Sequence, residues 1–448
     1  MNPVAPVTKY DMVGMLDPQP PSKKDSSTGG HPYSWCTMHS PTGDSGASMS
    51  RDRLSGRIGS VDGFRGFAAL TVLGVHVWHG AGRPVPESHL GQAVATHISA
   101  GFIGVDFFFV ISGFVLFLPT CRNRGRFGSV RSYALRRTAR IVPLYWAMLA
   151  VLVLTLPLTT IAAVRGDHIG LNLAMHASFL QHSLGFALGL PEGFGLNGVV
   201  WTLSLEVCFY LLLPLVAARF YARPVLWFLL FWAVSGLWRY ACLSWANPTP
   251  EVPSLARLVL VTQLPTYLPH FALGMVGAWI LVRATDPSRP GGEAPVTPYV
   301  AVAAQVLGGA AMVWLMHTAG VIEVFGTPGT YDHVVLTLPV ATAFAILLMG
   351  TLAAPAWAQR PFDNPVTRKL GEISYGIYLW HLIVIGLAVR AIGWLTDSDA
   401  PADFLVLLAT VLSGTLLTAW LSHRFLEQPA IDWAKRRTTR TPRVVAAE

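Results

Sequence analysis

The chain has 448 residues, of which 52% are hydrophobic and only 12% are charged. Soluble globular domains carry about 25% charged residues, so the composition excludes a soluble protein and indicates a membrane protein. The formal net charge is +8, but the basic residues lie in clusters between apolar segments, as membrane topology requires. We therefore expect a membrane-lipid environment and no nucleic-acid partner.

Residues 1–57 differ in composition from the rest of the chain. They are rich in Pro, Gly, Ser and Lys and contain no long apolar run, which is typical of a disordered tail. The membrane domain is expected to cover residues 58–430, and residues 431–448 are expected to form a basic C-terminal tail.

Ten segments between these tails are long and apolar enough to be transmembrane helices. They cover approximately 64–81, 99–119, 141–161, 199–218, 222–242, 264–282, 298–317, 334–354, 374–395 and 403–423. The apolar segment 172–190 also contains Asn172, His176, Gln181 and His182, so we expect a re-entrant or interfacial piece there. The predicted fold class is an all-α integral membrane protein, a bundle of about ten transmembrane helices.

The basic residues predict the orientation of the bundle. With the N-terminus inside, the predicted cytoplasmic regions hold all but five of the 32 lysine and arginine residues. Cytoplasmic loops carry such an excess of positive charge, and an even number of spans places both termini on one side. We therefore predict a multi-pass protein, in a bacterial cell membrane, with both termini cytoplasmic.

Four ionisable residues lie inside the predicted spans at comparable depths. At 1.5 Å per helical residue, His76 lies about 16 Å above the inner face, and Asp106, Glu206 and His270 lie about 10 Å below the outer face. Ionisable groups at such depths are costly and mark functional sites. A histidine oriented by a carboxylate can act as a general base. The alternative is a set of separate interhelical hydrogen bonds.

A second group of residues suits the recognition of phosphate. Arg137 and Arg140 are three residues apart, so a helix places them on one face. Paired guanidinium groups bind phosphate oxygens, although anionic lipid headgroups are a competing ligand. His381 lies about 10 Å above the predicted inner face, nearer these arginines than His76.

The sequence lacks the motifs of several common enzyme classes. No Gly-x-Ser-x-Gly elbow, phosphate-binding loop or dinucleotide-binding βαβ unit is predicted. No metal-ligand spacing stands out either, so we expect no metal cofactor.

Taken together, these segments resemble the membrane acyltransferase type 3 family over residues 58–430. The blocks that carry the resemblance are, in chain order, Asp62–Gly66, the Arg65-to-His76 spacing, Gly104–Phe114, Arg137-x-x-Arg140, Trp201–Glu206, Ser374–His381 and Phe425–Pro429. Each block is weak alone, but their order and spacing together are specific.

The resemblance implies an acyl-CoA donor, most simply acetyl-CoA, that enters from the cytoplasm, and a hydroxyl-bearing acceptor. It implies a catalytic His76, with Arg65, Arg137 and Arg140 on the donor side, where we also place His381. Members of the family acylate glycans, cell-envelope sugars and macrolide antibiotics, so a sugar-containing acceptor is expected.

The hypothesis from the sequence is therefore a membrane O-acyltransferase. His76, helped by Glu206 or Asp106, would remove or relay the proton of the acceptor hydroxyl. A transporter or flippase is the alternative, because many spans with intramembrane ionisable residues also suit that class. Such a protein would need neither a phosphate-binding site such as the one predicted at Arg137 and Arg140 nor a thioester donor.

Overall fold

The computed structural model describes residues 59–155, 169–184, 196–245, 255–285, 297–325, 330–392 and 401–438. Every regular element within these ranges is a helix, which confirms the all-α prediction. The predicted N-terminal tail, residues 1–57, lies outside the described residues.

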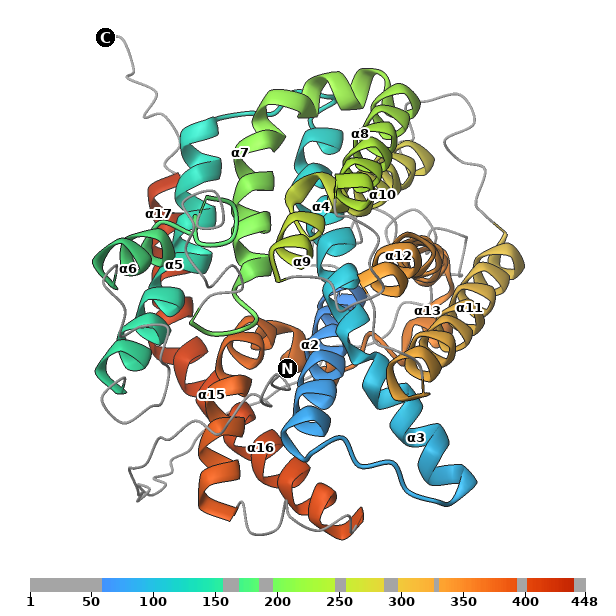
Figure 1. The fold of residues 1–448 in the computed structure, drawn as a ribbon. Helices are drawn as coiled ribbons and strands as arrows, with labels where there is room; N and C mark the ends of the chain where they lie inside the picture. Colours follow the sequence, from blue (N-terminus) through green and yellow to red (C-terminus); the bar gives the residue numbers. More distant parts are fainter. Residues whose placement is uncertain are drawn as a thin grey trace, which may run out of the picture. The chain divides into compact units, whose positions relative to one another are not determined.

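Figure 1 shows the helices in the order of the chain. In chain order they are α2 (Gly59–Gly80), α3 (His89–Ser99), η1 (Ala100–Ile103), α4 (Gly104–Arg122), α5 (Val130–Thr155), α6 (Ile169–Ala177), α7 (Trp201–Ala222), α8 (Pro224–Trp245), α9 (Leu255–Val261), α10 (Leu264–Ala284), α11 (Pro298–Phe325), α12 (Thr330–Ala353), α13 (Ala356–Gln359), α14 (Pro365–Glu372), α15 (Ser374–Ile392), α16 (Pro401–Ser422), the π-helical turn η6 (His423–Glu427) and α17 (Gln428–Thr438).

Nine of the ten predicted spans coincide with helical stretches that are long and apolar enough to cross a membrane, as far as the chain is described. The tenth falls on α2, a helix of 22 residues that carries Asp62, Arg65, His76 and His79. These polar residues lower its hydropathy, and most of its side chains are buried by neighbouring helices. The structure is thus a multi-pass membrane bundle with a polar helix in its interior.

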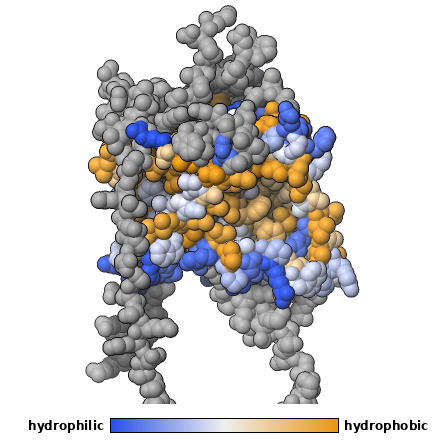
Figure 2. Space-filling view, turned by 90° about the horizontal axis from the view of Figure 1, so that it is seen from below, coloured by the Kyte–Doolittle hydropathy of each residue, from blue (hydrophilic) through white to orange (hydrophobic). Residues whose placement is uncertain are grey.

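The surface agrees with this assignment. Figure 2 shows a band of hydrophobic side chains between two hydrophilic rims. Large exposed apolar residues on α8 and α11 contribute to the apolar surface, among them Leu237, Val306 and Trp314. A contiguous apolar surface of this kind is the face that a bundle presents to lipid tails.

The segment predicted to be re-entrant or interfacial contains only a short helix in its described part. Helix α6 has nine residues, or about 13 Å at 1.5 Å per residue, which is too short to cross the roughly 30 Å hydrocarbon core of a bilayer. Its polar residues are satisfied locally: His176 lies 2.8 Å from the carbonyl of Asn172 and accepts a hydrogen bond from the amide of Leu196 at 2.9 Å.

Two helices extend beyond the apolar segments that predicted them. Helix α3 precedes the second predicted span and is capped by Ser88, whose hydroxyl accepts a hydrogen bond from the amide of Gly91 at 3.1 Å. Helix α5 begins at Val130, before the predicted third span at 141–161. Both extensions are polar or amphipathic, so hydropathy alone does not reveal them.

Helices α4 and α10 cross at very close range because each carries a glycine at the contact. A Cβ atom at Gly113 would lie 2.1 Å from the carbonyl oxygen of Phe271, and one at Gly274 would lie 1.9 Å from that of Val110. Only a residue without a side chain fits either position. Small residues at helix contacts are the usual means of close packing in membranes.

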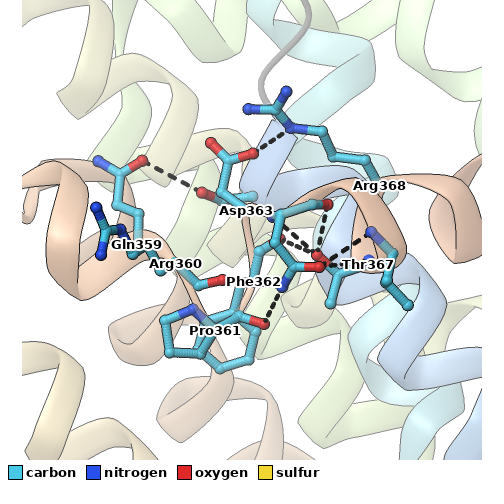
Figure 3. A network of polar contacts seen from close by, with 10 residues as sticks. Gln359, Arg360, Pro361, Phe362, Asp363, Thr367 and Arg368 are labelled. Carbon is cyan, nitrogen blue, oxygen red and sulfur yellow. Dashed lines mark hydrogen bonds and ion pairs between the residues drawn. The ribbon is translucent and has the colours of Figure 1, made fainter.

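Helix α2 lies between α4 and α15 (Figure 1) and contacts both. Its N-terminal turn is held by the segment before α14, where Phe362 stacks on Phe64 with ring centroids 4.1 Å apart. Figure 3 shows that this segment is fixed by its own polar contacts, which include the Asp363–Arg368 ion pair and the hydroxyl of Thr367. The start of α2, and hence the rotation of its polar face, is thereby set.

Candidate active site

The candidate catalytic histidine of α2 lies against a histidine of α15. Nδ1 of His76 is 3.3 Å from Nε2 of His381, and the two ring centroids are 5.0 Å apart. His381 is fully buried, whereas His76 is partly exposed. The depth estimate separated these two residues, but the structure brings them together because α2 and α15 pack side by side.

The hydrogen bonds of the pair define which nitrogen carries the proton in each neutral ring. Nδ1 of His76 lies 2.8 Å from the carbonyl oxygen of Val72, and Nδ1 of His381 lies 3.1 Å from that of Ile377. A carbonyl oxygen can only accept, so we assign the proton to Nδ1 in both rings. Nδ1–H of His76 is then shared between the Val72 carbonyl oxygen at 2.8 Å and Nε2 of His381 at 3.3 Å, and Nε2 of His76 retains its lone pair. A lone pair on a partly exposed imidazole is a general base.

The carboxylate of Glu206 lies in a separate group of hydrogen bonds. It accepts from the hydroxyl of Ser112 on α4 and from that of Tyr210 one turn further along α7, each at 2.7 Å. The guanidinium carbon of Arg137 lies 5.9 Å from the centroid of the Tyr210 ring, within cation–π range. Arg65 lies within electrostatic reach of Arg140, Asp62 and Glu206. Glu206 is therefore associated with two of the predicted donor-side arginines.

The two arginines of α5 have different surroundings. Arg140 lies 3.7 Å from the carboxylate of Glu427, which is fully buried, and His423 lies at the same distance from that carboxylate. These contacts give the buried carboxylate two basic neighbours and tie η6 to α5. Arg137 is partly exposed, and its buried Nε has no hydrogen-bond partner within the described structure.

Asp106 is paired with His270 rather than with His76. Its Oδ1 lies 2.8 Å from Nε2 of His270, and both residues are buried between α4 and α10. The sequence predicted one shared polar site for Asp106, Glu206, His76 and His270. The structure instead distributes their hydrogen bonds over three groups, which is the alternative that the sequence left open.

Two residues of the site were not found from the sequence. His79, in the last turn of α2, lies with its ring centroid 6.3 Å from that of His76, and its Nε2 lies 3.7 Å from Oε1 of Glu323 on α11. The three-residue spacing of the two histidines was the available signal, because i and i+3 share a helix face. Glu323 gave no signal, since only the packing of α11 brings it to α2.

The described residues contain no group of three or more His, Cys, Asp or Glu side chains that could hold a metal ion. What these residues do provide is an imidazole base backed by a second imidazole, with a cationic cluster of Arg65 and Arg137 around Glu206. This combination suits group transfer from an anionic donor.

The fold and the site therefore define a multi-pass membrane protein with a pair of histidines in contact inside the bundle. Residues 58–424 match the model of the acyltransferase type 3 family, which describes an acyltransferase domain. The chain belongs to this family and is a membrane O-acyltransferase.

Several characterised proteins are similar to the chain. The exopolysaccharide production protein ExoZ of Rhizobium meliloti is 28% identical over 361 residues, which cover 78% of this chain and 95% of ExoZ. Nodulation protein 10 of Rhizobium leguminosarum bv. viciae is 28% identical over 397 residues, 85% of this chain and 95% of that protein.

A third relative, the peptidoglycan O-acetyltransferase OatA of Listeria monocytogenes, is 26% identical over 388 residues. The alignment covers 83% of this chain and 55% of OatA. No solved structure matches the chain.

Proposed function

We propose that the protein transfers an acetyl or other short acyl group from acyl-CoA to a hydroxyl group of a sugar-containing acceptor, in a bacterial cell membrane. The observation that carries the proposal is the pair of contacts that Nδ1 of His76 makes with the Val72 carbonyl and with His381, which leaves Nε2 to act as the base. Family membership supplies the reaction class. The names of ExoZ and OatA, which refer to an exopolysaccharide and to peptidoglycan, favour a cell-envelope glycan over a macrolide.

In the proposed reaction, Nε2 of His76 takes the proton of the acceptor hydroxyl while the oxygen attacks the thioester carbonyl. The tetrahedral intermediate collapses with cleavage of the carbon–sulfur bond. The leaving thiolate then takes the proton from His76, so the products are the ester and free coenzyme A. General base catalysis of this kind contributes about 10²- to 10⁴-fold in rate.

His381 acts on His76 as a positioning residue. Its Nε2 accepts the hydrogen bond of Nδ1–H, so it holds the ring and stabilises the imidazolium that forms during the reaction. The second histidine occupies the place that a carboxylate has in many catalytic triads.

The donor side is the cationic cluster around Glu206. Among the described residues the buried Nε of Arg137 has no hydrogen-bond partner, and this arginine suits the phosphate groups of coenzyme A. Arg65 carries a second positive charge within electrostatic reach of Glu206. Arg140 contributes charge but is already paired with Glu427. Glu206 orients this cluster through its hydrogen bond with Tyr210, over whose ring Arg137 lies. Asp106 has a structural role, because its hydrogen bond with His270 joins α4 to α10.

The test uses the full chain in lipid with radiolabelled acetyl-CoA and a glycan fraction extracted from the cells that express it. Label should move to carbohydrate with the wild-type protein, and His76→Gln should reduce the rate by about 10²-fold or more. The control is His317→Gln, an exposed histidine of α11. Release of coenzyme A without labelled carbohydrate would refute the proposal that the acceptor contains a sugar. Equal rates for His76→Gln and the wild type would refute the role of His76 as the general base.

A further inference from the structure

The pair of His79 and Glu323 has no role in the reaction as derived above, yet it lies beside the catalytic histidine. The ring centroids of His76 and His79 are 6.3 Å apart on one face of α2. Across from them, Glu323 approaches His79 from α11 at 3.7 Å. The His79 side chain is 35% exposed and that of Glu323 is 10% exposed, so a ligand can reach the pair.

The contacts of His76 indicate on which side the acceptor must bind. Its Nδ1 edge is occupied by the Val72 carbonyl and by His381 on α15. The acceptor therefore approaches Nε2, the remaining nitrogen. His79 is the next ionisable side chain along this face of the helix, because residues i and i+3 are neighbours on its surface.

The two groups lie within ion-pair range, and a hydroxyl can bind beside the pair. A direct hydrogen bond between a ring nitrogen and a carboxylate oxygen measures about 2.7–3.2 Å, and the His79–Glu323 distance of 3.7 Å exceeds that range. A hydroxyl group can donate to the carboxylate and interact with the imidazole at the same time, since it is both donor and acceptor. Hydrogen bonds to an ionised carboxylate are stronger than those between neutral groups.

We propose that His79 and Glu323 form an acceptor subsite that binds a hydroxyl group adjacent to the one that reacts. The 6.3 Å between the two histidine rings is a span that one sugar ring with its hydroxyl groups bridges. An acceptor with neighbouring hydroxyls, held by the pair, presents the next hydroxyl to Nε2 of His76. The inference rests on the proposed function and names residues that select polyhydroxylated acceptors within it.

The experiment measures initial rates with the full chain in lipid nanodiscs. The probe is the extracted glycan fraction, added at graded concentrations with saturating radiolabelled acetyl-CoA, and then with acetyl-CoA varied. Glu323→Gln and His79→Gln should each raise the half-saturating concentration of the glycan fraction by about tenfold or more. The half-saturating concentration of acetyl-CoA should stay within about twofold. The matched control is His317→Gln on the same helix as Glu323, and it should leave both values unchanged.

The outcomes separate the subsite from the reaction. Unchanged glycan saturation in Glu323→Gln, with transfer intact, overturns the subsite and leaves the proposed function standing. A lower maximal rate without a change in glycan saturation also overturns it, because the pair would then act on His76 rather than on the acceptor. Absence of transfer by the wild-type protein, with acetyl-CoA binding intact, overturns the proposed function and the subsite with it. Retained acetyl-CoA binding by each variant shows that it has folded.

Discussion

Replacing His381 by phenylalanine tests the histidine pair most directly. Phenylalanine fills a similar volume in the fully buried site but offers no acceptor to Nδ1–H of His76, which lies 3.3 Å from Nε2 of His381. His76 keeps its bond to the Val72 carbonyl, so its tautomer survives, while its imidazolium form loses one hydrogen bond.

The size of the effect follows from that single bond. A hydrogen bond to a charged group contributes about 1.5–3 kcal/mol, which corresponds to a fall in kcat of roughly 10- to 150-fold. The loss should be smaller than that of His76→Gln, which removes the base itself. His381→Gln should recover part of the rate, because the side-chain oxygen of glutamine can take the position of Nε2 as an acceptor.

The assay follows release of free coenzyme A with a thiol reagent, together with transfer of radiolabel, for the wild type and both variants. KM for acetyl-CoA should remain near the wild-type value, because His381 contacts His76 in the structure. If His381→Phe retains the wild-type kcat, His381 does not support the base. If it raises KM for acetyl-CoA at constant kcat, His381 belongs to the donor side, as the sequence predicted.

Two further variants test the donor side and the packing. Arg137→Ala should weaken acetyl-CoA binding by about tenfold or more, since it removes a cation suited to a phosphate group. The control is Arg136→Ala, which removes an exposed arginine and should leave binding unchanged. Equal titration curves for the two variants would show that Arg137 is not part of the donor site. Gly274→Ala should lower the melting temperature in detergent and cost about 1–3 kcal/mol, because its Cβ would meet the Val110 carbonyl at 1.9 Å. Gly74→Ala is the matched control, because open space surrounds its Cβ position and alanine is the better helix former; equal melting temperatures for both would contradict the close crossing.

Much of the fold could be predicted because a bilayer constrains the length and composition of every segment that crosses it. Each span must hide its backbone polar groups in a helix and present about 20 apolar residues, so the length and charge of each segment sufficed to find the spans. The polar residues of the segment 172–190 kept it out of the set of predicted spans, and the helix found at its start, α6, has only nine residues. Helix α3 was missed because its amphipathic sequence carries no transmembrane signal.

Local chemistry within one helix could be predicted as well. The spacing of Arg137 and Arg140 places them on one face of any helix that contains both, and α5 does contain both, although it begins before the predicted span. The contact of Glu427 with Arg140, by contrast, joins η6 to α5 and depends on how these two elements pack.

The sequence by itself determined which residues would be expensive to place inside a membrane, His76, Asp106, Glu206 and His381 among them, because that cost depends on residue type and depth. Only the tertiary structure decided how they are paired. His76 meets His381 across 305 positions of sequence, since α2 and α15 pack together. Depth along the membrane normal is one coordinate, and it carries no information about which helices are neighbours. Neighbours are chosen by the close contacts of small and aromatic side chains, and those contacts form only in three dimensions.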